Sequence, residues 1–122
     1  LPQASKRGSL RLVTNPYECL MTAEGATATS DVLLFMTSGT PTHDILRQTC
    51  FSSPCDALAA AIDCGCACPT APNTLVSYPF QSEDPFLFPQ TPHLMVATNQ
   101  SEFSTRLHSS TSAKGSKTVT RL

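Results

Sequence analysis

The sequence predicts a small mixed α/β domain, and three features carry this prediction. An apolar run at 31–37 is typical of a buried strand, a capped helix follows at 54–64, and a second short apolar strand covers 94–97. The 122 residues allow at most one ordinary domain, or a piece of a larger one. The longest apolar run, Ala57–Ile62, is far shorter than the ~20 residues that cross a bilayer, so no membrane span is predicted.

The first elements are predicted in the N-terminal part of the chain. Leu10–Val13 alternates weakly and stops at Asn15-Pro16, which predicts a strand that runs into a turn. The strand at 31–37 is apolar without alternation, so we expect both of its faces to be covered, and Ser38-Gly39 ends it. His43–Arg47 predicts one short helical turn.

The helix at 54–64 has the clearest local signals in the chain. Ser53 is a favoured N-cap residue, Pro54 fits the first helical position, and Asp56 suits the positive end of the helix dipole. Gly65 can adopt the left-handed conformation that commonly ends a helix. The helix is therefore predicted to begin after Ser53 and to end at Cys64.

The C-terminal half begins with a long proline-rich segment, Pro69–Pro92. A disordered linker would be polar and poor in aromatic residues, whereas this segment is apolar, so we expect an irregular but packed structure. The strand at 94–97 follows, then a flexible Ser/Thr/Lys/Gly tail from His108 to Lys117, and a last strand that begins at Thr118–Thr120. The aromatic residues of the proline-rich segment are Tyr78, Phe80, Phe86 and Phe88.

Charge is unevenly distributed, although the formal net charge is only −1. All charged side chains in residues 1–17 and 103–122 are basic, and all nine acidic residues lie between these two ranges. Basic ends could contact phosphate, but no aromatic residues interleave with the bases to stack on nucleotides. We therefore interpret the ends as solvated termini, and the balance excludes a strongly basic nucleic-acid-binding tail.

Six cysteines raise the question of a metal site. Cysteine makes up about 5% of the chain, below the ~8–10% that marks a disulfide scaffold. A zinc site, unpaired thiols in a reduced compartment and a redox role all remain open, and a disulfide within the closely spaced triplet would be strained. The candidate metal ligands are Cys50, Cys55, Cys64, Cys66 and Cys68.

Several motifs, in this order, resemble one protein family. They begin with Leu12-Val13-Thr14-Asn15-Pro16-Tyr17 and Thr37-Ser38-Gly39, and the most specific ones are Cys68-Pro69-Thr70-Ala71-Pro72-Asn73-Thr74-Leu75 and Asp84-Pro85-Phe86-Leu87-Phe88. Tyr78-Pro79-Phe80 and Pro92-His93 complete the set. From about residue 10 to its end, the chain is similar to the C-terminal part of the small, non-catalytic B subunits of DNA polymerase delta.

The resemblance implies a fold larger than this chain. Residues 1–122 would form the C-terminal part of a calcineurin-like phosphoesterase β-sandwich, in which two sheets pack face to face with helices outside. An oligonucleotide-binding-fold domain and the first half of the phosphoesterase-like domain would lie upstream. A chain that begins at Leu1 without Met is consistent with a truncated or processed product.

The resemblance also implies that the domain is catalytically inactive and holds no cofactor. Active relatives bind two metal ions through Asp, His and Asn side chains at strand ends. Here the strand at 94–97 is followed by Thr98-Asn99-Gln100-Ser101, where an active relative is expected to show Gly-His-x-His. Ser38, Gly39 and Asn99 are thus interpreted as the vestigial rim of an active site. The cysteine triplet takes positions where relatives carry Arg, His and Ser, which argues against a zinc site typical of the family.

The function implied is that of a nuclear scaffold in DNA replication. It would link the C-terminal cysteine-rich module of the catalytic subunit to a further accessory subunit and meet DNA only indirectly. Tyr78, Phe80, Phe86 and Phe88 are candidate interface anchors, and the competing interpretation is that they close the core of their own domain. The alternative function is a small zinc or thiol module that uses the cysteines. We also expect the isolated chain to be poorly soluble, because half a domain exposes sheet edges and apolar faces.

Overall fold

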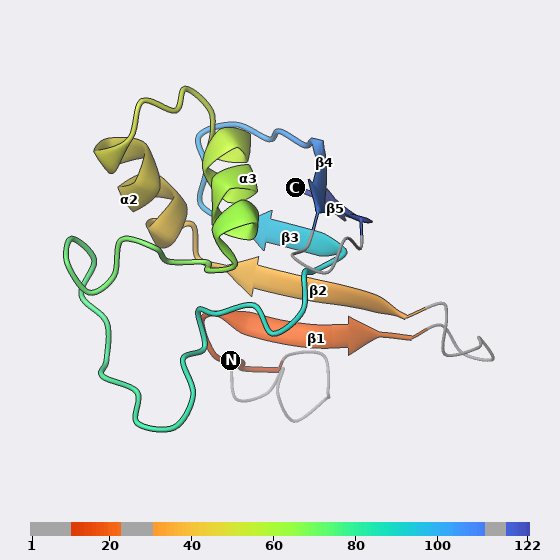
Figure 1. Ribbon diagram of the computed structural model, residues 1–122, viewed down its shortest axis with the longest axis horizontal. Helices are drawn as coiled ribbons and strands as arrows, with labels where there is room; N and C mark the ends of the chain where they lie inside the picture. The colour runs from red at the N-terminus through yellow and green to blue at the C-terminus, as the bar shows by residue number, and fades with distance from the viewer. Residues whose placement is uncertain (1–10, 23–30, 112–116) are drawn as a thin grey trace.

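The computed structural model describes residues 11–22, 31–111 and 117–122. In this part of the chain, five strands form one sheet and two helices lie between β2 and β3 in sequence (Figure 1). The sheet order is β1-β2-β3-β5-β4; β2, β3 and β5 are parallel, whereas β1 and β4 are antiparallel edge strands. None of the described helices has the length and apolar character to span a membrane. The elements are β1 (Tyr17–Met21), β2 (Val32–Thr37), α2 (Thr40–Gln48), α3 (Pro54–Cys64), β3 (Leu94–Ala97), β4 (Leu107–Thr111) and β5 (Lys117–Arg121).

The predicted apolar strand is present as β2, but only one of its faces is buried. Leu33, Phe35 and Thr37 are buried, while the alternate residues Leu34 and Met36 are half-buried. The period-2 geometry of a strand sends successive side chains to opposite faces, and the helices cover only one of them. The expectation that both faces are covered is therefore wrong for the part of the chain described.

The strand predicted at Leu10–Val13 is wrong. Leu10 lies outside the described residues, and Leu12 and Val13 are exposed and outside the sheet, at 83% and 50% of full exposure. The strand instead follows Asn15-Pro16, as β1 (Tyr17–Met21), which pairs antiparallel with β2. The weak apolar alternation at 10–13 is not enough to form a strand, whereas residues 17–21 form one because they pair with the central apolar strand β2.

The helix prediction at 54–64 is confirmed at both ends by α3. The Ser53 side chain accepts a hydrogen bond from the Asp56 amide at 3.2 Å, and Gly65 ends the helix with φ of +71°. By contrast, the short turn expected at His43–Arg47 is a nine-residue helix, α2. Gly39 at its N-cap and Pro41 in its first turn start this helix three residues earlier than predicted.

The flexible tail predicted from His108 to Lys117 is also wrong where the structure describes it. Residues 107–111 form β4, which pairs antiparallel with β5 (Lys117–Arg121), while residues 112–116 lie outside the description. The last strand expected at Thr118–Thr120 is confirmed within β5. The Ser- and Thr-rich composition of β4 predicted a flexible tail, but an edge strand needs few apolar side chains and can therefore be polar.

The core lies between the sheet and the two helices. Phe35 of β2 and Met95 of β3 are cross-strand partners, and both are almost fully buried, at 2% and 1% exposure. They pack with Ile45 of α2, and with Leu58 and Ile62 of α3. Burial of side chains of this size stabilises the fold by about 1.5–3 kcal/mol each.

The opposite face of the same sheet is apolar but much less covered. Tyr17 and Cys19 pair with Met36 and Leu34, so these four side chains share the face that points away from the helical core. All four are half-buried in the described structure. The same face carries Met21, Val32, Leu94 and Val96.

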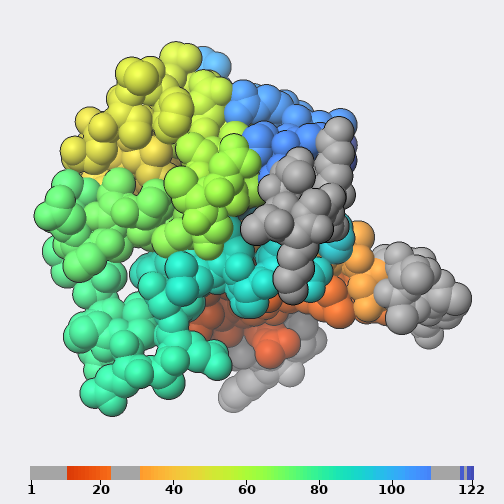
Figure 2. All heavy atoms as spheres, in the orientation of Figure 1, coloured from red at the N-terminus to blue at the C-terminus, as the bar shows by residue number. Residues whose placement is uncertain are grey.

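The proline-rich segment is irregular, as predicted, but it is packed only in part, because Val76, Tyr78 and Leu87 are exposed at 95%, 74% and 54%. It is anchored to the rest of the fold at several points. The Thr74 hydroxyl donates to the Asp44 carboxylate at 2.6 Å, which ties the start of the segment to α2. At its other end, His93 bonds Leu33 twice, through its backbone amide and its Nδ1 atom, both at 2.9 Å. Between these anchors the segment projects from the body at the lower left of Figure 2.

Candidate functional site

The predicted rim residues come together where the parallel strands β2 and β3 end. The Thr98 amide donates to the Thr37 carbonyl at 3.0 Å, which places Ser38 and Gly39 beside the segment that holds Asn99. Gly39 has φ of +80°, and a Cβ at this position would collide with the Thr98 carbonyl. Asn99 also has a positive φ, of +60°. Glycine is therefore required at 39 by backbone conformation and by space.

Asn15 completes this rim and was not predicted from the sequence. Its Oδ1 accepts from the Ser38 amide at 3.1 Å, and its Nδ2 donates to the Ser38 hydroxyl at 3.0 Å. The Ser38 and Thr40 hydroxyls lie 3.3 Å apart. The rim therefore presents hydroxyl and amide groups, which are neutral and bind no metal strongly. An Asn two residues before the first strand was the available signal, but its partner is 23 residues away.

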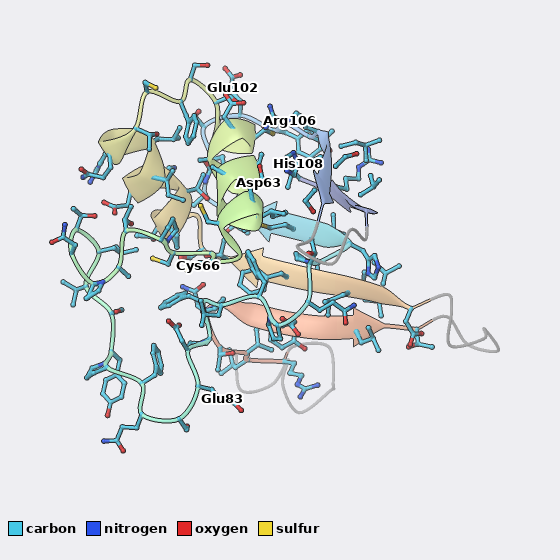
Figure 3. All side chains as sticks on the ribbon, in the orientation of Figure 1. Asp63, Cys66, Glu83, Glu102, Arg106 and His108 are labelled. Atoms are coloured by element: carbon cyan, nitrogen blue, oxygen red, sulfur yellow. The ribbon has the colours of Figure 1, made fainter. Side chains whose placement is uncertain are left out.

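The three histidines lie apart and serve different contacts. His93 is bonded to Leu33 of β2, and His108 of β4 lies 2.8 Å from the Asp63 carboxylate at the end of α3 (Figure 3). His43 lies on α2 and lines an open cleft with Asn99 and Gln100. The structure does not bring the three imidazoles together.

The candidate cysteine ligands do not assemble either. All six cysteines are free, and the described residues contain no group of three or more His, Cys, Asp or Glu side chains placed to hold a metal ion. Cys50 and Cys64 are exposed, whereas Cys55 and Cys68 are buried. Burial raises the pKa of the half-buried Cys66 thiol and of Cys68. Protonated thiols are poor ligands and nucleophiles, so this geometry favours structural cysteines.

Cys55 and Asp56, at the start of α3, are tied to the segment that leads into β4. The Cys55 sulfur lies 3.5 Å from the Ser104 hydroxyl, and Arg106 donates to the Cys55 carbonyl and to the Asp56 carboxylate, both at 2.7 Å. The hydrogen bond from Arg106, followed by that from Ser53, holds the pKa of Asp56 below its usual value. These contacts fasten the last strands of the sheet to the helix layer.

The four candidate aromatic anchors divide into two pairs. Phe88 packs edge-on against the buried Phe35, with ring centroids 4.8 Å apart, and Phe86 also packs against the core. Tyr78 and Phe80 are exposed, at 74% and 45%, although they contact each other at 5.8 Å. Phe86 and Phe88 thus pack against the core, whereas most of the Tyr78 side chain and nearly half of Phe80 face outward. The centroids of Phe80 and Phe86 are 6.1 Å apart, which joins the two pairs.

Backbone hydrogen bonds hold this aromatic segment against the end of α3. The Ala67 amide donates to the Phe86 carbonyl at 2.7 Å, and the Phe88 amide donates to the Gly65 carbonyl at 2.9 Å. An isolated antiparallel bridge joins Cys66 to Leu87. The residues around the cysteine triplet therefore support, through backbone pairing, the segment that carries the exposed aromatic side chains.

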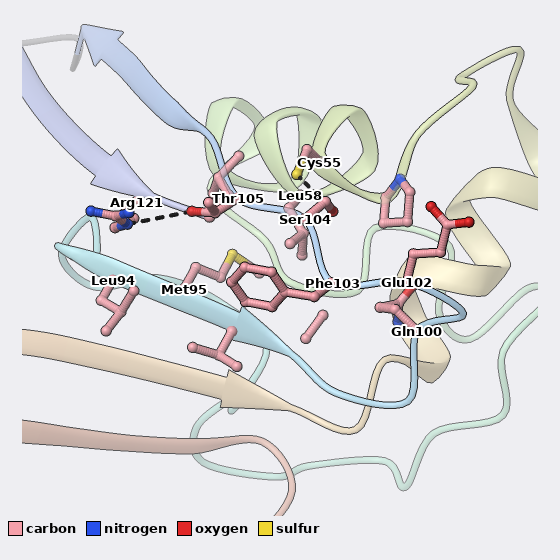
Figure 4. Close-up of a pocket in the computed structure, with 14 residues that line it drawn as sticks. Cys55, Leu58, Leu94, Met95, Gln100, Glu102, Phe103, Ser104, Thr105 and Arg121 are labelled. Carbon is pink, nitrogen blue, oxygen red and sulfur yellow. Dashed lines mark hydrogen bonds between the residues drawn. The ribbon is translucent and has the colours of Figure 1, made fainter.

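A second exposed apolar feature lies at the other end of the molecule. A cavity of about 240 Å³ opens between the start of α3, β3 and residues 100–105 (Figure 4). Cys55, Leu58 and Met95 line it, and Phe103 stands at its rim with 94% of its surface exposed. Phe103 could not be predicted from the sequence, because one aromatic residue in a polar stretch has no periodic signal.

Comparison with known proteins places the chain in a protein family. Residues 1–105 match the family of the DNA polymerase alpha/epsilon B subunit. The chain is 36% identical over 118 residues to DNA polymerase delta subunit 2 of Drosophila melanogaster, which is 97% of this chain and 26% of the relative. It is 30% identical over 106 residues to the DNA polymerase delta small subunit of Arabidopsis thaliana, 87% of this chain and 22% of the relative. The chain thus spans about a quarter of the length of these relatives.

Proposed function

Because the chain belongs to the DNA polymerase alpha/epsilon B subunit family, we propose that it is a segment of the small, non-catalytic subunit of DNA polymerase delta. The observation that carries the proposal is the 36% identity, over 97% of the chain, to a relative named as a subunit of that polymerase. The proposed role is to hold other subunits together during DNA replication in the nucleus. This segment contributes about a quarter of such a subunit.

The apolar outer face of the sheet supports a larger domain with a second layer. Tyr17, Cys19, Leu34 and Met36 present a contiguous apolar surface that α2 and α3 do not cover. Sheets with two apolar faces are covered on both sides in folded domains. We infer that a second sheet packs here, as in a phosphoesterase-like β-sandwich, and that an oligonucleotide-binding-fold domain lies upstream. That residues 1–122 form the C-terminal part of this domain stays a prediction, which the comparisons do not confirm.

The chemistry of the strand-end rim supports a scaffold rather than an enzyme. A phosphoesterase that uses two metal ions needs several carboxylate and imidazole ligands at this edge. The described residues offer the neutral side chains of Ser38, Thr40, Asn15 and Asn99 there. The imidazole of His43 lies in the same cleft as Asn99, but no group of metal-ligating side chains forms around it among the described residues. We infer that the rim is a vestigial site and that the protein acts by binding other chains, without a cofactor.

The exposed aromatics support a protein partner at the projecting segment. Large aromatic side chains dominate the energetics of many protein interfaces. Tyr78 and Phe80 are exposed while Phe86 and Phe88 hold the segment to the core, so the pair is presented on an anchored support. We propose that Tyr78 and Phe80 contact the C-terminal cysteine-rich module of the catalytic subunit or a further accessory subunit.

Co-purification tests this function. The complete subunit that contains this segment is expressed with the C-terminal cysteine-rich module of the same organism's polymerase delta catalytic subunit, and the complex is isolated by gel filtration. We expect the module to remain bound, and Tyr78→Ala with Phe80→Ala to weaken binding by about tenfold or more. Phe103→Ala is the matched control, because Phe103 is also exposed but lies at the other end of the molecule.

Two results would contradict the proposal at different levels. If the unaltered subunit does not retain the module or any other polymerase subunit, the scaffold function is wrong. If the complex forms and only Phe103→Ala weakens it, the scaffold function stands but the interface lies at the cavity of Figure 4 instead.

A further inference from the structure

An open cleft lies between β1 and the proline-rich segment, on the side of the sheet that carries the core. Its volume is about 390 Å³, within the range of small ligand sites. The Phe80 ring, which is 45% exposed, supplies aromatic surface, the almost fully buried Phe35 also borders the cleft, and Pro85 is one of three prolines in its walls. Glu18 and Glu83, together with Asp84, supply the charged groups. The cleft therefore combines aromatic rings with carboxylates.

Two separate parts of the chain bring these groups together. The register of β1 on β2 pairs Glu18 with Phe35, so both side chains lie on the same face of the sheet. The Asp84 carboxylate accepts a hydrogen bond from the Phe86 amide at 2.9 Å, which fixes the turn that follows Glu83. The packing of Phe88 on Phe35 then holds this turn over β1. The acidic side of the cleft is thus supported by the fold.

The charges in the cleft are not balanced within the described structure. Among the described residues, the carboxylates of Glu18 and Glu83 have neither a hydrogen bond nor an ion pair with a side chain, and no basic residue lines the cleft. A bound anion would be repelled. A cation would meet carboxylates from β1 and from the proline-rich segment and would lie near the Phe80 ring, and aromatic rings attract positive charge.

We propose that this cleft binds an arginine side chain of a protein partner, flanked in the partner by apolar residues. The guanidinium group is flat, so it can stack on the Phe80 ring while its N–H groups donate to the carboxylates of Glu18 and Glu83. The exposed Tyr78 and Leu87, at 74% and 54%, lie on the same segment and would receive the flanking apolar residues. The proposal rests on the scaffold function, because it requires a protein partner.

Charge complementarity is what selects this occupant. A purely apolar partner segment would leave carboxylates facing it without a counter-charge, which costs binding free energy. An arginine neutralises them and still buries its aliphatic stem against the exposed Leu87 and the prolines of the cleft. The site therefore adds specificity to the apolar contacts proposed for Tyr78 and Phe80.

The test uses the complete subunit in complex with the catalytic-subunit module. Binding affinity is measured for the unaltered subunit and for Glu18→Gln combined with Glu83→Gln, which removes charge with little change in shape. We expect a loss of affinity of about tenfold or more, and a weaker dependence of affinity on salt between about 0.05 and about 0.5 M. Glu102→Gln is the matched control, because Glu102 is exposed and lies at the opposite end of the molecule from Glu83 (Figure 3).

The outcomes separate this proposal from the scaffold function. If the module binds the unaltered subunit and the double variant equally well, with the same salt dependence, the arginine site is refuted and the scaffold function stands. If the double variant loses thermal stability but keeps its affinity, the cleft is filled from within the subunit and the proposal is again refuted. If the unaltered subunit retains neither the module nor any other polymerase subunit, the scaffold function itself fails. Replacing partner arginines one at a time by Lys should identify a single position whose loss is not additive with the double variant.

Discussion

Replacing Gly39 by Ala should destabilise the domain more than the same change at Gly65, although both glycines have positive φ. Gly39 lies at +80° and Gly65 at +71°, so alanine at either position carries the strain of the left-handed conformation, about 1–2 kcal/mol. A Cβ at Gly65 would meet no atom within 4 Å. That position therefore measures the backbone cost alone.

At Gly39 the added Cβ would collide with the backbone carbonyl of Thr98, which cannot rotate away as a side chain could. Because Thr98 is fixed by its hydrogen bond to Thr37, relief requires that the ends of β2 and β3 move apart. Forced overpacking of this kind typically adds about 1–3 kcal/mol. We expect a total loss of about 2–5 kcal/mol for Gly39→Ala, against about 1–2 kcal/mol for Gly65→Ala.

Thermal unfolding of the complete subunit, followed by calorimetry, measures both variants under the same conditions. The difference between the two midpoints isolates the steric contribution, since the conformational strain is common to both. If Gly39→Ala unfolds at the same temperature as Gly65→Ala, the close approach of the two strand ends is not what requires glycine there, and our account of the rim is wrong.

Three further outcomes are expected. The carboxylate of Asp56 has a lowered pKa in the fold, so its contribution to stability is present above the unfolded pKa of about 4 and is lost as pH falls through the folded pKa. Asp56→Asn should therefore reduce the fall of the unfolding midpoint at acid pH, measured in a pH series. An unchanged fall would contradict this account. Buried Cys68 and half-buried Cys66, with raised thiol pKa, should react with iodoacetamide more slowly than exposed Cys50 when followed by peptide mass spectrometry; equal rates in the native protein would contradict the burial. The 122-residue chain alone should be poorly soluble or only partly folded and should be rescued by the rest of the subunit, whereas a sharp cooperative melt of the isolated chain would refute this.

Local signals predicted the helices and strands whose causes are local. The ends of α3 follow from side-chain capping at Ser53 and the left-handed Gly65, which involve only adjacent residues. The strands β2 and β3 follow from apolar runs long enough to need burial. By contrast, β4 is polar and is specified by its pairing with β5, and β1 is specified by its pairing with β2. Both pairings join consecutive strands, but the residue types within one strand do not reveal which segment it pairs with.

Only part of the candidate site could be predicted from the sequence. The motif residues Ser38, Gly39 and Asn99 do meet at one edge, because parallel strands end side by side. Asn15 was missed, since its hydrogen bonds to Ser38 connect residues far apart in sequence. Whether an aromatic lies in the core or on the surface could not be decided from residue type, and the packing of Phe88 on Phe35 decided it.

The pairing of β2 with β3 has a consequence for how the chain reaches its native state. Leu33 and His93 bond each other across 60 residues, and both helices lie in the chain between them. Closing so long a loop delays parallel pairing relative to the antiparallel β1–β2 pair, which depends on nearby residues. During synthesis the growing chain would therefore display an apolar β1–β2 ribbon for some time. We expect slow folding that benefits from chaperones, or from a partner that binds while the chain is still being made.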